Sequence, residues 1–70
     1  MPIAIAPSGQ KMKILKILTD EKTKKHLENL GLTVNSDITV LSKSGGSVIC
    51  LVKEGRLALD SGVVTKIFVS

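Results

Sequence analysis

Aromatic residues are almost absent from this chain of 70 residues, which has one Phe and neither Trp nor Tyr. Proteins that bind single-stranded nucleic acids usually stack bases on aromatic side chains, and Phe68 alone is a poor platform for them. Recognition of proline-rich peptides likewise needs a groove lined by aromatic residues. Both activities are therefore disfavoured, and the core has to be built from Ile, Val and Leu.

Residues that carry catalysis or bind metals are also scarce, since the chain has one His and one Cys. His26 and Cys50 match no standard metal-site spacing, and apart from the adjacent Asp20 and Glu21 the acidic residues are scattered along the sequence. A weak site shared between chains, with Glu28 as an added carboxylate, stays open. No serine lies in the sequence context of a hydrolase nucleophile. We expect a protein that is not an enzyme and has no catalytic residue, no metal site of its own and no cofactor.

A second cysteine, a long apolar run and a signal-peptide pattern are missing as well. Cys50 lies within a short apolar segment, which predicts a buried thiol in a reducing compartment. No apolar stretch approaches the ~18 residues that span a bilayer. Residues 1–7 lack the basic and apolar regions of a secretion signal. We expect a cytoplasmic protein without direct membrane insertion.

Positive charge predominates, because the chain has ten Lys and Arg residues and six Asp and Glu residues, which gives a net charge of +4. Arg56 is the one arginine, so most cations are point-charge donors rather than bidentate ligands. This composition is typical of a solvated basic surface, and an acidic partner stays open.

One helix is predicted at residues 21–30. Asp20 is a good N-cap before it, and Gly31 suits the left-handed residue that follows a helix end. Leu27 and Leu32 have the spacing of the apolar contact that accompanies such an ending. The segment therefore predicts a short surface helix with one side packed onto the domain.

Short strands separated by turns account for the rest of the chain. Asn35 tolerates a left-handed conformation before the later strands, and Pro2 and Pro7 would confine the first strand to an edge. The predicted turns cover residues 43–46, 54–55 and 60–62, and the predicted strands cover residues 3–6, 12–18, 38–42, 47–53, 56–59 and 63–69. The pattern predicts one mainly β domain over residues 1–70, a small barrel of five to six strands with one short α-helix between the early strands.

The run over residues 47–53 is apolar without interruption, which predicts a strand covered on both faces or nearly so. If one face remains open, either Ile49 and Leu51 or their neighbours present apolar side chains to a partner. Gly45 and Gly46 precede this run, and they predict a hairpin turn rather than a phosphate cradle.

Together these elements resemble the family of ferrous iron transport protein A (FeoA), the small cytoplasmic component of bacterial ferrous iron uptake. The resemblance covers residues 8–69. It depends on the order and spacing of Gly9, Ile14 and Ile17, then Leu27, Leu30, Gly31 and Leu32, then Ile38 and Val40, then residues 55–59, and finally Ile67 and Val69.

Three positions depart from the family pattern. Asn35 follows Val34 where Pro-Gly is common, and Asn can adopt the same left-handed conformation. His26 stands where a basic residue often precedes the helix leucine. Asp60 replaces a frequent Arg, and this charge reversal puts any role carried over to that position in doubt.

The resemblance implies an SH3-like barrel, similar to the C-terminal barrel of iron-dependent repressors. It also implies a module that binds the cytoplasmic side of the ferrous iron permease and GTPase FeoB, with weak Fe²⁺ association and self-association left open. Rim contacts to the partner are expected from Lys24, Lys25, His26 and Arg56. A regulatory barrel that acts on a repressor or on nucleic acid is the alternative, although no nucleic-acid partner is expected.

Overall fold

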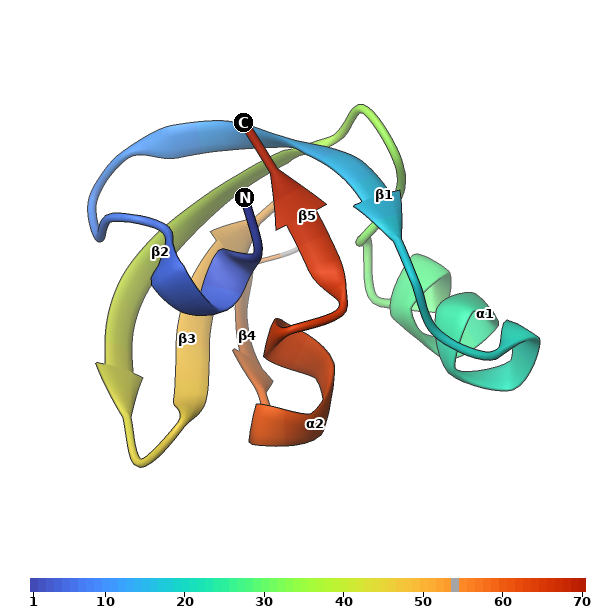
Figure 1. Ribbon diagram of the computed structural model, residues 1–70. Helices are drawn as coiled ribbons and strands as arrows, with labels where there is room; N and C mark the ends of the chain where they lie inside the picture. The colour runs from blue at the N-terminus through green and yellow to red at the C-terminus, as the bar shows by residue number, and fades with distance from the viewer. Residues whose placement is uncertain (54) are drawn as a thin grey trace.

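A curled antiparallel sheet forms the framework of the computed structural model, which describes residues 1–53 and 55–70 (Figure 1). Within this part of the chain the strand order is β4-β3-β2-β1-β5. The strands are β1 (Lys11–Ile17), β2 (Asp37–Ser44), β3 (Ser47–Val52), β4 (Gly55–Leu59) and β5 (Ile67–Val69). The prediction of a mainly β fold with a helix between early strands is confirmed, and the strands number five among the described residues.

The helix α1 (Glu21–Asn29) follows the sequence prediction closely. The Asp20 carboxylate accepts a hydrogen bond from the Thr23 amide at 3.3 Å, which satisfies one of the free amides at the start of the helix. Gly31 has φ +96°, a left-handed conformation that turns the chain out of the helix. Asn35 has φ +74°, so the second predicted left-handed residue is also confirmed.

A tight hairpin joins β2 to β3 through Gly45 and Gly46. Their φ values are +56° and +85°, as a type I′ turn requires at both central positions. Ser44 and Ser47 pair directly across the turn, so β2 continues through residues that the sequence assigns to the loop. The predicted hairpin is confirmed with a shorter turn.

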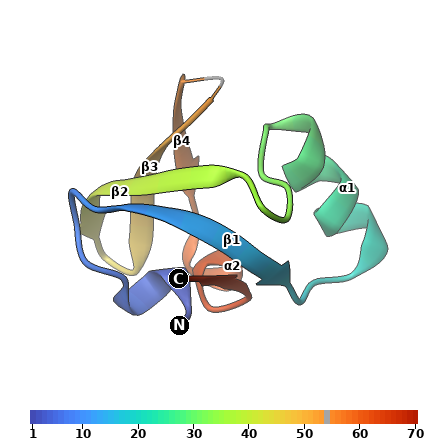
Figure 2. The ribbon, with the colours of Figure 1, turned by 90° about the horizontal axis from the view of Figure 1, so that it is seen from above.

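β-Bulges bend the two longest strands. In β1 the register with β5 shifts at Leu15, and in β2 the register with β3 shifts at Leu41. A bulge adds one unpaired residue and increases the local twist. The sheet therefore curls around its inner face, while α1 lies beyond the end of β1 (Figure 2).

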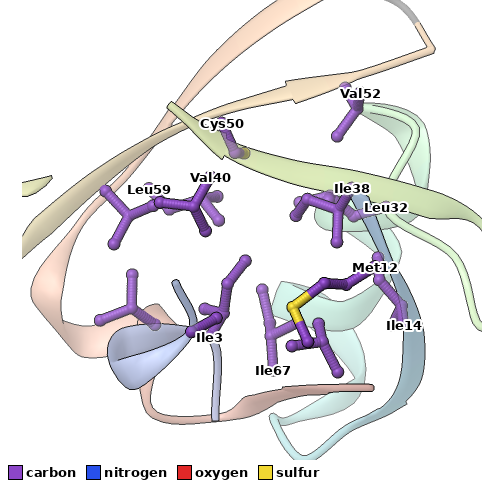
Figure 3. Close-up of a cluster of buried hydrophobic side chains, with 14 of the residues drawn as sticks. Ile3, Met12, Ile14, Leu32, Ile38, Val40, Cys50, Val52, Leu59 and Ile67 are labelled. Carbon is purple, nitrogen blue, oxygen red and sulfur yellow. The ribbon is translucent and has the colours of Figure 1, made fainter. Parts of the chain in front are cut away.

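The inner face of the sheet encloses a core of aliphatic side chains (Figure 3). Ile14, Ile67 and Val69 have no exposed surface, and Ile38 and Val48 have 2% each. The remaining members come from the 3-10 helix η1 (Ile3–Ile5) and the residue after it, from α1 and the turn that follows it, from the short helix α2 (Ser61–Val64), and from other strand positions. They are Ile3, Ala6, Met12, Ile17, Leu27, Leu32, Val40, Cys50, Val52, Leu59 and Val64. A core without aromatic residues is thus filled by Ile, Val and Leu, as the composition predicts.

The predicted edge strand at residues 3–6 is wrong. The segment instead begins a 3-10 helix, η1 (Ile3–Ile5), in which the Ala6 amide donates to the Ile3 carbonyl at 3.1 Å. Ile3 and Ala6 are buried while Ile5 is exposed, and a spacing of three is the period of a 3-10 helix. The strand-like contacts precede this segment: Met1 exchanges two backbone hydrogen bonds with Val69, and Pro2 forms an isolated bridge to Phe68.

The predicted turn at residues 60–62 contains the start of another helix, α2 (Ser61–Val64). The Asp60 carboxylate accepts a hydrogen bond from the Gly62 amide at 3.1 Å and so acts as its N-cap. The predicted last strand is consequently shortened to β5, whose Ile67 and Val69 share the buried face as expected.

Candidate protein-interaction surface

The outer face of β3 carries exposed apolar side chains. Burial alternates along the strand, so that Ile49 is 42% exposed and Leu51 is 45% exposed, whereas Cys50 between them is fully buried. The expectation that residues 47–53 are covered on both faces is therefore wrong. The physical reason is the placement of α1 beyond the end of β1, since this leaves the outer face of the sheet to solvent (Figures 1 and 2).

Neighbouring strands extend this apolar surface. Ile49 pairs with Ala58 of β4 and with Ser42 of β2, where the bulge adds Leu41 on the same stretch of strand. Leu41 is 37% exposed and Ala58 is also exposed. We call Leu41, Ile49, Leu51 and Ala58 the outer sheet patch. Ile49 and Ala58 are directly opposed and so close enough to touch, Leu51 follows Ile49 two residues along the same face, and Leu41 adjoins the residue that pairs with Ile49.

Cations lie at one end of this patch. The cross-strand pairs Lys11–Thr39, Thr39–Leu51 and Leu51–Arg56 form a row across four strands, with a basic residue at each end. Lys53 follows β3 directly after its last residue and is exposed. We call Lys11, Lys53 and Arg56 the cationic end.

An acidic residue is held beside this end by two lysines. The Asp37 carboxylate lies 3.1 Å from the Lys13 Nζ and 3.5 Å from the Lys11 Nζ. The hydrogen bond from Lys13, with the charge of Lys11, lowers the pKa of Asp37 below its ordinary value. The carboxylate therefore stays ionised and its charge is more than balanced by its two partners.

A shallow hollow of about 500 Å³ adjoins the cationic end. Its walls include Lys11 and Lys53, and Thr39 and Leu51 from the central row also line it. Asp37 also lines the hollow, where it pairs with Lys11, so Lys53 is the lysine of this wall without a carboxylate partner among the described residues. The hollow thus combines an apolar side chain with two cations and one carboxylate, and its net positive charge suits an acidic or amphipathic ligand.

The predicted partner-binding residues are divided by the fold. Arg56 belongs to the cationic end, whereas Lys24, Lys25 and His26 lie on α1. Successive residues of a helix point about 100° apart, so these three do not share a face. Lys24 is half-buried, while Lys25 and His26 are exposed. Their role in partner binding stays a prediction.

Another hollow, of about 390 Å³, separates the end of α1 from β4. Arg56 and Leu57 line it from the strand, and Glu28 and Leu30 line it from the helix end. Lys24, Lys25 and His26 do not contribute to its walls. Among the four predicted partner-binding residues, Arg56 is thus the one that lines the hollow between α1 and β4.

Three residues of this surface were not predicted from the sequence: Lys11, Leu41 and Lys53. Leu41 faces outward because it continues the alternation of the buried Ile38 and Val40, a signal that the sequence does contain. Lys11 joins the row through strand register, which is not visible in a single sequence. The alternation of side chains along a strand placed Ile49 and Leu51 on one face of β3, but the sequence left open whether they or their neighbours face outward.

The candidate metal ligands lie in different surroundings. Cys50 is fully buried, with its Sγ 3.5 Å from the Leu57 carbonyl oxygen, and burial raises the pKa of its thiol to about 11. His26 is exposed on α1. In the described part of the chain no three His, Cys, Asp or Glu side chains are grouped so that they could hold a metal ion.

None of the helices in residues 1–53 and 55–70 has the length and apolar character needed to cross a membrane.

Comparison with known proteins gives consistent matches. The family model described as the FeoA domain matches residues 1–70. The chain is similar to a crystal structure of "Iron Uptake Regulatory Protein (FeoA)", with 28% identity, a TM-score of 0.83, and coverage of 97% of this chain and 90% of that one. Comparison with curated proteins gave no match.

More distant structures share the fold. A FeoA protein from Chlorobium tepidum has 15% identity and a TM-score of 0.87, and the match covers 99% of this chain and 68% of that one. A manganese-dependent transcriptional repressor has 18% identity and a TM-score of 0.88, with all of this chain matching 35% of the repressor. These likenesses confirm the predicted SH3-like barrel.

Proposed function

The chain belongs to the FeoA family, and on this basis we propose that it is a cytoplasmic, non-enzymatic accessory protein of bacterial ferrous iron uptake. In this role it docks on the cytoplasmic part of the ferrous iron permease FeoB. The observation that carries the proposal is the outer sheet patch, because Ile49 and Leu51 expose apolar surface on a regular strand. Contiguous exposed apolar surface on a small domain is typical of protein interaction.

The apolar and the charged residues of this surface are expected to contribute differently to partner binding. Apolar side chains that become fully desolvated supply most of the affinity at protein interfaces. Charges at the rim chiefly set the rate of encounter and the choice of partner. We therefore assign affinity to the outer sheet patch and steering to the basic residues around it, with Lys24, Lys25 and His26 as further candidates for rim contacts.

The test is a calorimetric titration of the chain with the purified cytoplasmic domain of FeoB, without nucleotide and with GDP or a non-hydrolysable GTP analogue. We expect saturable binding in at least one nucleotide state. Ile5→Thr is the control variant, because it removes an apolar side chain that is 69% exposed on η1 and lies outside the outer sheet patch. We expect this variant to bind the FeoB domain as tightly as the unaltered chain does. Absence of binding at several hundred micromolar in every nucleotide state would overturn the proposal.

Nucleic-acid binding has weaker support as an alternative. Phe68 is half-buried, and the Lys16 Nζ lies 5.0 Å from the centre of its ring, so a cation–π contact already occupies this aromatic face. The likeness to the repressor concerns the fold at 18% identity. Fluorescence anisotropy with single- and double-stranded DNA at low salt tests this alternative, since binding through phosphates is strongest there.

A further inference from the structure

We infer that the outer sheet patch binds an acidic amphipathic segment of a partner protein, in one orientation. The carboxylates of the segment lie over the cationic end, and its apolar side chains lie on Ile49 and Leu51. This inference rests on the proposed docking function and adds the chemistry and orientation of the segment that is bound.

The patch has two chemically different ends along β3. Leu41, Ile49 and Ala58 lie toward the hairpin of Gly45 and Gly46, whereas Leu51 lies next to Arg56 and near Lys53. Ile49 and Leu51 are two residues apart, which is about 7 Å along a strand. An amphipathic segment with carboxylates at one end and apolar groups at the other therefore matches this surface in only one direction.

The spacing across the strands limits the size of the acidic part. Lys11 and Arg56 stand at the two ends of a row that crosses three gaps between strands. At about 4.8 Å per gap, their backbones are up to about 14 Å apart. Lysine and arginine side chains are long, so two or three carboxylates on one short segment are enough to contact both residues.

The hollow beside Leu51 supplies an anchoring position. Lys11 and Lys53 border it, and Leu51 and Thr39 line it. A large apolar side chain of the partner can enter this hollow while a neighbouring carboxylate pairs with Lys53, since Lys11 already pairs with Asp37. Anchors of this kind, surrounded by charged groups at the rim, carry much of the binding energy of protein interfaces.

Charge distinguishes an acidic partner from a second copy of this chain. A symmetric dimer through this patch would place both cationic ends in one interface, because both copies use the same surface, and it would juxtapose them when the β3 strands of the two copies run parallel. When the strands run antiparallel, each cationic end would instead lie over the apolar end of the other copy, which offers it no carboxylate. Juxtaposed like charges oppose association, and each chain carries a net charge of +4. The Asp37 carboxylate offers little compensation, since Lys11 and Lys13 already pair with it.

Paired variants of exposed residues test the inference by titration with the FeoB cytoplasmic domain. We expect Leu51→Thr and the double variant Lys53→Glu/Arg56→Glu each to weaken binding at least tenfold. The matched controls are Leu18→Thr, which alters a leucine that is 54% exposed beyond the end of β1, and Lys22→Glu/Lys66→Glu, which makes the same change in net charge at exposed positions. We expect both controls to bind within twofold of the unaltered chain. Thermal unfolding of every variant provides the check on folding.

The salt dependence and the location of contacts provide a second measurement. The affinity of the unaltered chain is expected to fall as salt rises from 50 to 300 mM, and that of the Lys53→Glu/Arg56→Glu variant to change less. Amide NMR shifts of the labelled chain are expected to move in β2, β3 and β4.

Each other outcome contradicts a specific statement. If the unaltered chain binds and the patch variants bind equally well, the inference is wrong and the docking proposal stands. If the unaltered chain does not bind, the docking proposal itself fails. Self-association in analytical ultracentrifugation that Leu51→Thr abolishes would assign the patch to a second copy. Sedimentation with phosphatidylglycerol vesicles that Lys53→Glu/Arg56→Glu abolishes would assign it to an anionic membrane.

Discussion

The backbone amide of Leu32 donates a hydrogen bond to the carbonyl of Leu27 across 2.9 Å, and both side chains are buried in the core. The Gly31 amide makes the companion bond to the Glu28 carbonyl at 3.0 Å. This pair of bonds is the Schellman ending, and here it attaches the end of α1 to the sheet. The helix is thus held in place by a turn whose geometry depends on one residue.

Replacing Gly31 tests this dependence. Gly31→Ala places a Cβ on a residue with φ +96°, and we expect it to lower the free energy of unfolding by about 1–2 kcal/mol. Gly31→Asn is the matched variant and should cost less, because Asn tolerates the left-handed region. Urea unfolding followed by circular dichroism measures both. Equal stability of the alanine variant and the unaltered chain would contradict this account of the helix end.

Adjacent residues of β1 offer a comparison of core and surface. Ile14 has no exposed surface, whereas Leu15 is 50% exposed at the bulge. We expect Ile14→Ala to cost about 2–5 kcal/mol by loss of burial and creation of a cavity. That is a large part of the roughly 4–10 kcal/mol expected for a domain of this size. Leu15→Ala should change stability by less than about 0.5 kcal/mol. A similar loss from both substitutions in urea unfolding would contradict the difference in burial between Ile14 and Leu15.

The two glycines of the hairpin are expected to differ. A Cβ at Gly46 would lie 3.2 Å from the Ser61 Cβ of α2, whereas a Cβ at Gly45 would meet nothing within 4 Å. Both residues have positive φ, so each alanine variant carries backbone strain. Gly46→Ala should therefore lower the melting temperature more than Gly45→Ala. The reverse order would contradict the packing of α2 against this hairpin.

Because its thiol is buried, Cys50 is expected to react slowly with alkylating reagents in the folded chain. Burial raises its pKa from 9.0 to about 11, so at pH 8 the folded chain holds roughly 100-fold less thiolate than the unfolded chain. We expect iodoacetamide to label the native chain at least 100-fold more slowly than the chain in urea. Equal labelling rates would show that the thiol is accessible.

The same shift predicts how stability changes at high pH. Because the folded pKa exceeds the unfolded value, the stabilisation from the protonated thiol is complete below about pH 9 and is lost as the pH rises toward 11. Cys50→Ala should reduce this loss, although it removes packing at every pH. Urea midpoints at pH 7, 9 and 10.5 measure the difference in slope between the two chains.

The end of α1 could be predicted from the sequence because its determinants are local. Gly31 supplies the left-handed residue, and the spacing of Leu27 and Leu32 supplies the apolar contact. No information about distant parts of the chain is needed. The same holds for the Gly45–Gly46 turn, where two adjacent glycines specify the turn type.

Other segments depend on tertiary packing. Ile3 and Ala6 are buried because the sheet curls toward them, and this favours a 3-10 turn over the edge strand that the flanking prolines suggest. The short α2 follows an N-cap at Asp60, a signal present in the sequence but too brief to distinguish from a turn.

The apolar part of the candidate site could be predicted from local sequence, whereas its cationic part depends on tertiary structure. Alternation identifies Ile49 and Leu51 as members of one face, but the sequence does not state whether α1 covers that face. The cationic end depends on the register between four strands, which brings Lys11 into line with Arg56. Register of this kind follows from turns and bulges acting together.

The sheet contains two kinds of strand pairing, which join either neighbouring or distant segments of the chain. β2, β3 and β4 are neighbours in sequence as well as in space, whereas β1 pairs with β5 and so brings Ile14 beside Val69. Bringing β1 and β5 together closes a longer loop of the chain, and this costs more chain entropy than forming the β2–β3 or β3–β4 hairpin. The meander of β2, β3 and β4 is therefore the part that can form earliest during folding, and it carries most of the surface to which we assign partner binding. A nascent or partly open chain would accordingly present much of its docking face before its two ends meet.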